Sequence, residues 1–397
     1  MSRFVRSSLV RLGCAVAVVL TSRALHAQLP FIPFGARSVA LGGASVGLAD
    51  AAGGVLDNPA AVEGAPVGVS ATLGAEGNES GDFLAPLRLI SGNDPVTLST
   101  QAGAASAADV RAALLTLSQR GNGLLADGRA GAVVVYRRWG IGLAEYAWAG
   151  VSTRADLIHV QSGNDPATSF RNNRSVAAFR GLTIQDLSLS RGISFLGGRI
   201  SVAGSAHLLR GITSSKEEAV FTTEVGDTVQ LGRRSLSGTE RTELAFSADA
   251  GVAVKVGIFR AGAVVKAINN PSFRFDETEG PIADRGASVT YGPQARVGAS
   301  VHIPLIGIVV AADYDVTKSD TLIDGLQSRE VGGGVEWTLG VIALRGGVSI
   351  NLESPDQTKR ISGGLGIGFG PVKADAAVIY RPDRSALGAV LSARLKL

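Results

Sequence analysis

Charged side chains at alternating positions in otherwise apolar segments are the residues of this chain best placed to do chemistry. They include acids and bases, which favours ion pairs over a surface of one sign. Asp313 and Asp315 are two residues apart, so on a strand they share a face and repel each other unless a base lies beside them. Arg296 and Arg345, on predicted neighbouring strands, are the candidates for that base. The full set is Asp249, Lys255, Arg260, Lys266, Arg296, Asp313, Asp315, Glu330, Glu336, Arg345, Arg360, Lys373 and Asp375.

The histidines and one nearby serine offer little for a metal site or for catalysis. His159, His207 and His302 lie on separate segments, without the spacing of metal ligands. Ser205 and His207 share one strand face, but no acid that could orient the histidine is near in the sequence. We therefore expect no metal, no cofactor, no catalytic residues and no enzyme activity.

Period-two alternation of apolar and polar residues is the dominant pattern from about residue 180 onward. Residues 244–256, for example, place Leu244, Phe246 and Val252 on one side and Asp249 and Lys255 on the other. Such segments have about ten residues or more, enough to cross a bilayer when tilted. Fourteen strands are predicted, at 65–75, 128–138, 140–160, 180–192, 198–213, 242–256, 258–270, 288–302, 305–317, 328–338, 341–352, 360–369, 371–381 and 386–397.

The connections between these strands alternate in length. Short turns are predicted near 192–198, 256–258, 303–305, 338–341 and 369–371, and longer polar loops at 214–242, 271–287, 317–328 and 353–359. Short turns on one rim and long loops on the other are typical of bacterial outer-membrane barrels. Alternation also fits a soluble periplasmic β protein, but the segments are longer than the ~5–6 residues usual for soluble strands. We therefore predict an all-β, closed, antiparallel transmembrane barrel with both ends periplasmic.

The first 27 residues resemble a secretory signal. Arg3, Arg6 and Arg11 precede an apolar run from Leu12 to Leu20, and Ala27 is a suitable cleavage position. Cleavage there removes four arginines, so the formal charge falls from +4 to zero and the basic pI does not indicate nucleic-acid binding. The only Cys, at position 14, would also be lost, which excludes disulfides and thiolate sites. We expect the mature chain in the cell outer membrane.

Two segments interrupt the strand pattern. Residues 28–64 are rich in Gly and Ala, with Gly42 and Gly43 permitting tight bends and Asp57 standing before Asn58-Pro59. This segment is predicted to be a hatch that plugs the lumen, with a loose periplasmic tether as the alternative. Residues 76–127 form a predicted insertion, with a helix at 106–119 that lies over one mouth or flat on the rim. Residues 83–92 could be a further strand.

Small and aromatic residues add detail to the predicted wall. A GxGxGxG run has period two and no following helix, so it is not a nucleotide loop and instead lets the wall approach a plug closely. It comprises Gly364, Gly366, Gly368 and Gly370. The residues expected in an interfacial girdle are Trp139, Trp148, Trp337, Tyr136 and Tyr380.

Several short motifs resemble those of the FadL-like outer-membrane barrels. Gly35-Ala36-Arg37, Leu41-Gly42-Gly43-Ala44, Ala49-Asp50 and Asn58-Pro59-Ala60 resemble the N-terminal hatch signature of that superfamily. It includes long-chain fatty acid transporters, the PorV and PorQ proteins of type IX secretion, and conjugal transfer proteins of the TraF type. Likeness to the TraF type is greatest, at Leu187–Ser190, Leu209–Gly211, Val264–Phe273 and Ala311–Asp315.

This resemblance implies binding or passage of a small hydrophobic compound across the outer membrane. Its implied hatch residues are Gly42, Gly43, Asp57, Asn58, Pro59 and Ala60. The lumen charges then either satisfy one another in a filled interior or form a polar gate whose pairs part during transport. The alternative function is a non-transporting scaffold of a secretion or conjugation complex. Its expected partner-binding loop is 214–242, with Lys216, Glu217, Glu218, Arg233 and Arg234.

Overall fold

The structure is a computed structural model. It describes residues 26–27, 29–48, 52–91, 104–156, 158–160, 173–220, 239–276, 287–353, 359–382 and 386–397. The leader predicted at 1–27 therefore falls almost wholly outside the described residues. None of the described helices is both long and apolar enough to cross a membrane.

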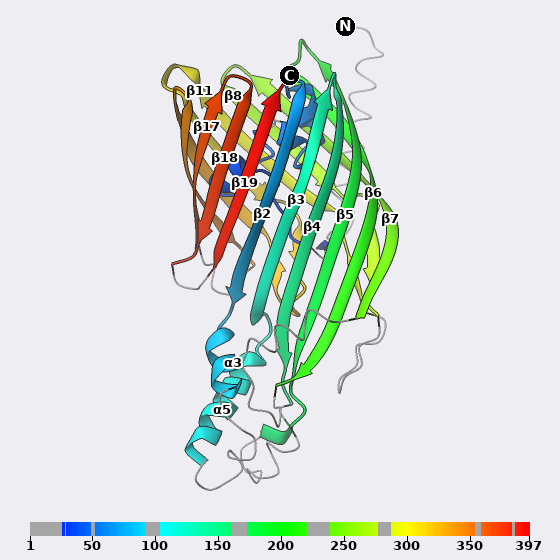
Figure 1. The fold of residues 1–397 in the computed structure, drawn as a ribbon, viewed down its shortest axis with the longest axis vertical. Coiled ribbons are helices and arrows are strands. Elements are labelled where there is room, and N and C mark those ends of the chain that lie inside the picture. Colours follow the sequence, from blue (N-terminus) through cyan, green and yellow to red (C-terminus); the bar gives the residue numbers. More distant parts are fainter. Residues whose placement is uncertain are drawn as a thin grey trace.

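Fourteen antiparallel strands close into one barrel, as predicted, with β19 pairing back onto β2 (Figure 1). The first residues of β2, the C-terminus and the short turns lie at one end of the barrel, at the top of Figure 1. The wall strands are β2 Gly68–Ser80, β3 Gly123–Tyr136, β4 Trp139–Arg154, β5 Val176–Phe195, β6 Ile200–Ala219, β7 Thr239–Val256, β8 Phe259–Lys266, β11 Gln294–Ile303, β12 Ile308–Asp315, β15 Glu330–Leu339, β16 Ile342–Asn351, β17 Lys359–Phe369, β18 Val372–Tyr380 and β19 Leu387–Lys396.

Alternation in the sequence sorts side chains between the two faces of this wall. Phe246 and Leu391 point outward and are 74% and 60% exposed, while Asp249 and Arg345 point inward and are buried. A lipid-facing apolar surface and a polar interior are the arrangement of outer-membrane barrels. Four of the five side chains predicted to form the girdle are exposed on the barrel. Trp148 is the exception, because it falls on the inward parity of β4 and is only 6% exposed inside the lumen.

The wall has two heights (Figure 1). Strands β4 to β7 have 16 to 20 residues, whereas β8, β11, β12 and β15 to β19 have 8 to 11. Ten residues tilted by ~40° span about 25 Å, the height of the apolar band of such barrels. On the tall side an outward polar ladder marks the limit of that band toward the long-loop end. Gln185 donates to Glu145 at 3.0 Å, and Arg210 donates to Gln185 at 3.3 Å.

The connection between β2 and β3 carries two helices, α3 Leu84–Ser91 and α5 Ala104–Leu117. Two boundaries are corrected here, since β2 runs on to Ser80 and β3 begins at Gly123, so the insertion is shorter than 76–127. The strand considered at 83–92 is wrong. Phe83 and Ile90 recur at helical spacing and are buried together, and the Glu79 carboxylate accepts the first backbone N–H groups of α3.

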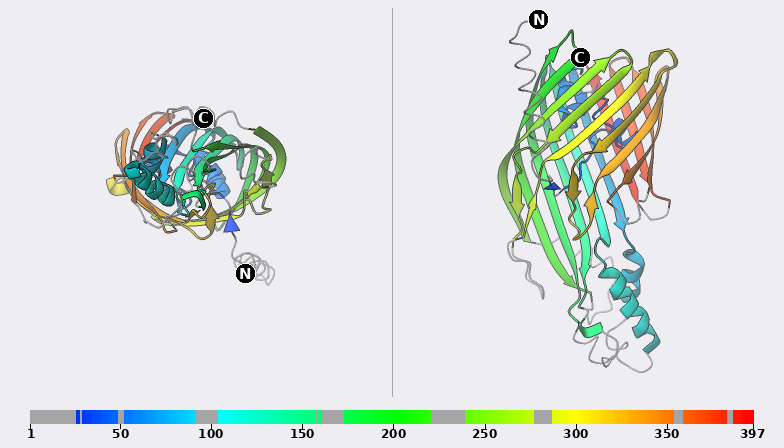
Figure 2. Two further views of the ribbon diagram at one scale, coloured as in Figure 1. Left: turned by 90° about the horizontal axis from the view of Figure 1, so that it is seen from below. Right: turned by 180° about the vertical axis from the view of Figure 1, so that it is seen from behind.

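This helical pair stands off the long-loop end, along the barrel axis (Figure 1). It does not lie flat on the rim, and from below it covers part of the mouth (Figure 2). Smaller elements complete the chain: β1 His26–Ala27, β9 Ser272–Arg274, β10 Ser288–Thr290, β13 Lys318–Asp320, β14 Gln327–Ser328 and the 3-10 turns η4 Ile158–Val160 and η5 Pro304–Ile306.

The hatch, residues 29–48 and 52–64 of the described chain, lies inside the barrel. It contains α2 Ala36–Ala40 and the 3-10 turns η1 Ala52–Leu56 and η2 Pro59–Glu63. Phe34, Leu56 and Val62 are buried against wall residues such as Val133 and Tyr146. Apolar hatch residues therefore fill much of the lumen and form its main core.

Candidate functional site

Carboxylates and one amide hold the hatch in place. Asp313 of β12 accepts the backbone N–H groups of Ser45 and Val46 at 2.7 and 2.8 Å. Asn58 caps η2 by accepting the N–H of Ala60 at 3.0 Å, and its amide also donates to the carbonyl of Val252 on β7 at 3.2 Å. Pro59 follows as the first residue of η2, where its missing N–H costs nothing.

The Asp57 carboxylate of the hatch is only half satisfied. Its Oδ1 accepts the Phe34 N–H at 2.8 Å, and its buried Oδ2 has no hydrogen-bond partner. Burial raises the pKa of the Asp57 carboxyl from 3.8 to about 6, partly offset by the nearby cations Lys266 and Arg296.

At several glycines the backbone of the hatch and the backbone of the wall are in direct contact, with no room for a side chain between them. Gly42 and Gly43 have φ of +68° and +86°, and a Cβ on Gly42 would lie 2.4 Å from the carbonyl oxygen of Val348. A Cβ on Gly364, in the GxGxGxG run of β17, would lie 2.5 Å from the Ala40 Cβ. The close approach expected of that run occurs at this glycine.

The predicted lumen charges form three groups. Arg345 contacts Glu336 at 2.6 Å and Asp375 at 2.8 Å, and Glu336 also binds Arg37 of the hatch at 2.8 Å. This places Arg345 away from the Asp313–Asp315 pair, for which Arg296 supplies the base, at 2.5 Å from Asp315.

In the third group, Arg360 bridges Glu330 at 2.6 Å and Glu76 at 2.9 Å. The remaining predicted charges are placed differently. Lys266 donates to the Leu56 carbonyl at 2.9 Å, and Arg260 to the Leu48 carbonyl at 3.2 Å. Lys255 is exposed at the turn end, and Lys373 is half-buried.

His207 lies between the carboxylates of Asp186 and Asp249, and the sequence did not predict that these three residues meet. Its Nδ1 is 2.9 Å from Asp186 and its Nε2 is 3.2 Å from Asp249. Both acids come from adjacent strands, at positions separated from His207 by 21 and 42 residues. Ser205 is bonded to Ser190 at 2.6 Å and not to His207, so these two residues do not form the serine–histidine pair considered above. A different pair, Ser300 and His302, is joined at 3.1 Å.

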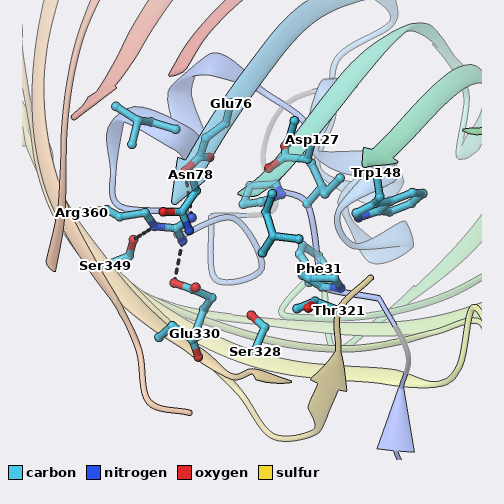
Figure 3. A pocket seen from close by; sticks show the side chains of 18 of the residues that line it. Phe31, Glu76, Asn78, Asp127, Trp148, Thr321, Ser328, Glu330, Ser349 and Arg360 are labelled. Carbon is cyan, nitrogen blue, oxygen red and sulfur yellow. Dashed lines mark hydrogen bonds and ion pairs between the residues drawn. The ribbon is translucent and has the colours of Figure 1, made fainter. Parts of the chain in front are cut away.

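A cavity of about 130 Å³ lies between the N-terminal part of the hatch and the wall (Figure 3). One side is apolar, with Phe31, Ile32, Trp148, Leu322 and Leu326. Across from these residues lie Glu76, Glu330 and Arg360, which are paired with one another, and next to Trp148 lies a further ion pair, Asp127 with Arg129. Sequence reasoning missed Glu76 and Asp127 because they are the end residues of the predicted insertion, and it missed Arg129 at the start of the predicted strand 128–138. The continued alternation through Glu76-Gly77-Asn78 and Asp127-Gly128-Arg129 was the available signal.

Four aromatic rings run across the lumen beside this cavity. Phe34, Tyr146, Trp148 and Tyr291 follow one another with ring centroids 6.0 Å apart, the Tyr146–Trp148 pair being stacked. The Tyr146 hydroxyl and the Trp148 indole N–H are buried without a hydrogen-bond partner. This series connects the hatch to the loop before β11, and its polar atoms are left available to a further group.

The closed wall and the hatch define an outer-membrane β-barrel of the FadL-like fold. The structure is similar to that of the toluene transporter TodX of Pseudomonas putida, with a TM-score of 0.52 and 14% identity over 92% of this chain and 98% of that one. It is also similar to the Ralstonia pickettii toluene transporter TbuX, with a TM-score of 0.51 and 13% identity over 92% of this chain and 98% of that one.

A match to a family model identifies the family itself. The chain belongs to the family described as "F plasmid transfer operon, TraF, protein", whose model matches residues 57–315. No curated protein sequence matches the chain.

Proposed function

We propose that this barrel binds a small hydrophobic compound and passes it across the outer membrane, without catalysis. The observation that carries the proposal is the cavity between hatch and wall, with its apolar side of Phe31, Ile32, Trp148, Leu322 and Leu326. A concave, mostly apolar site with a few polar groups is the usual form of a small-molecule site. The structurally similar TodX and TbuX are both toluene transporters.

Passage requires the hatch to shift, because it fills the lumen between the two mouths. The polar contacts that hold the hatch to the wall are suited to such a shift, because they are made by a few wall side chains. Asp313 binds the backbone at Ser45 and Val46, and Glu336 binds Arg37. The lumen charges then act as a polar gate, and the hatch residues Gly42, Gly43, Asp57, Asn58, Pro59 and Ala60 form the moving part. Cleavage after Ala27 and a periplasmic position of both barrel ends belong to the same proposal.

Ligand binding to the mature chain in mild detergent tests this function. Ser328 lines the cavity, so Ser328→Trp would fill it, while Ser328→Ala leaves it open. We expect toluene to bind the wild type and Ser328→Ala, measured by calorimetry, and to bind Ser328→Trp at least tenfold more weakly. Heat-modifiable migration shows whether each variant is folded. Equal binding to all three chains, or no binding of any apolar compound, would contradict the proposal.

The alternative, a scaffold of a secretion or conjugal-transfer complex, is favoured by one observation. Helices α3 and α5 stand beyond the rim with the apolar side chains of Leu89 and Leu115 exposed. The loop first expected to bind a partner is less suited, because Glu217 is paired with Arg154 and Lys216 with Glu218. Arg233 and Arg234 lie outside the described residues. Photocrosslinking from positions 89 and 115 in cells tests this alternative, which fails if no protein is captured.

A further inference from the structure

We infer that the cavity selects a neutral, single-ring aromatic compound that carries an oxygen acceptor, such as a phenol or an aryl ether, over a plain hydrocarbon. This inference rests on the proposed function and names its substrate class. It depends on two hydrogen-bond donors that line or adjoin the cavity, on the charge balance of its lining and on its volume.

Two buried donors have no partner on the cavity's β3–β4 wall. The Nε1–H of Trp148 and the Nε–H of Arg129 both lack a hydrogen bond, and both residues line the cavity. Trp148 is 6% exposed and Arg129 3%. They are near neighbours on the inner face, because Trp148 pairs with Asp127 in register and Arg129 follows two residues later. A buried donor without an acceptor carries a desolvation cost of about 1–3 kcal/mol, which a ligand oxygen would recover.

The cavity lining carries no surplus charge, because its three carboxylates are matched by three guanidinium groups, those of Arg129, Arg360 and Arg381. Arg381 donates to the Asn78 side chain and to the Glu79 carbonyl. The carboxylates are Glu76, Asp127 and Glu330, and each has a guanidinium partner: Arg360 at 2.9 Å, Arg129 at 3.0 Å and Arg360 at 2.6 Å, respectively. An anionic ligand would meet three carboxylates whose arginines are already engaged. Because burying an unpaired charge is costly, a neutral molecule is favoured over a benzoate or a fatty acid anion.

Size and lining limit the ligand to about one ring. The cavity measures about 130 Å³, and an engineered cavity of about 150 Å³ in another protein holds benzene. The rings of Phe31 and Trp148 both line the space (Figure 3), so an aromatic ligand would have aromatic surfaces to pack against. Oxygen on that ring could reach the indole N–H while the ring stays on the apolar side.

Paired ligands of equal shape test the inference. Phenol is compared with toluene, and anisole with ethylbenzene, by calorimetry on wild-type mature chain and on Trp148→Phe. Phenylalanine keeps an aromatic ring at this position and removes the N–H. We expect the preference for the oxygen-bearing member of each pair, as a ratio of dissociation constants, to fall about five- to tenfold in Trp148→Phe. Each ligand has the same hydration free energy in both experiments, so hydration cancels when the ratio for the variant is compared with the ratio for the wild type.

Trp337→Phe is the matched control, because Trp337 points outward and is 46% exposed. It should leave both ratios unchanged. If toluene binds and the ratios are the same in Trp148→Phe as in the wild type, the inference is overturned while the proposed function stands. If no compound binds the wild type, the proposed function fails with it. Should Trp148→Phe not fold, tighter binding of benzoate than of phenol to the wild type would by itself contradict the inference.

Discussion

The hatch meets the barrel through two different kinds of contact. Its first part, with α2 and residues 42–48, faces β11 to β19 through small apolar clusters and, in addition, through charges and hydrogen bonds to its backbone, as between Arg37 and Glu336. Its second part, with η1 and η2, faces β3 to β7 mainly through apolar packing of Leu56 and Val62. Charged contacts need fixed geometry, whereas apolar contacts tolerate small displacements. For the hatch shift proposed above, the first side would set the position of the hatch and the second would accommodate the displacement.

The largest expected effect is on the charged side. Arg345→Ala leaves the buried carboxylates Glu336 and Asp375 without their shared base. Removing one partner of a buried ion pair costs about 3–5 kcal/mol. We expect the thermal midpoint in detergent to fall by several degrees, read from heat-modifiable migration. Lys255→Ala, at the exposed rim, is the control and should change nothing.

The stability of the barrel should depend on pH through Asp57, which lies in the hatch between its charged and its apolar contacts with the wall. Because the folded pKa of Asp57 is about 6, above 3.8, the folded state holds its proton more tightly. Stability is then greatest below pH ~4, falls as the pH rises through 6, and is lower by about 3 kcal/mol at pH 7. Asp57→Asn should remove this contribution, so its unfolding midpoint should vary less between pH 4 and pH 7. Identical pH profiles for the two chains would show that Asp57 is not protonated in the fold.

Asp313→Asn tests the backbone anchor of the hatch. An amide keeps one acceptor oxygen but loses the charge that strengthens the bonds to Ser45 and Val46, a cost of about 2 kcal/mol. We expect faster proteolysis near residues 45–50. We also expect faster uptake of toluene into proteoliposomes that contain the variant. Unchanged cleavage would mean that the apolar side alone holds the hatch.

The smallest effect is expected on the apolar side. Val62→Ala removes two methyl groups from a 2% exposed position, a loss of about 1–2 kcal/mol. Since no charge is involved, proteolysis near residues 45–50 should stay as in the wild type. A loosening equal to that of Asp313→Asn would abolish the distinction between the two sides.

Much of the fold could be predicted because side-chain direction alternates strictly along a strand. That rule placed Asp249, Arg345 and Asp375 inward and identified fourteen wall strands. It failed at 83–92, where a helical repeat of apolar residues was interpreted as a possible strand. At Trp148 the rule holds, because its parity on β4 is inward, and the girdle prediction is wrong there because it rests on residue type.

The sequence by itself determined the all-β barrel, the face of most wall residues and the hatch-like composition of residues 28–64, because these depend on local periodicity. Only the tertiary structure decided which charge meets which, and where the cavity lies. Arg37 meets Glu336 across 299 residues, and Arg360 meets Glu76 across 284. Such pairs depend on strand register, on closure of β19 against β2 and on the path of the hatch through the lumen, and none of these is a property of a short segment.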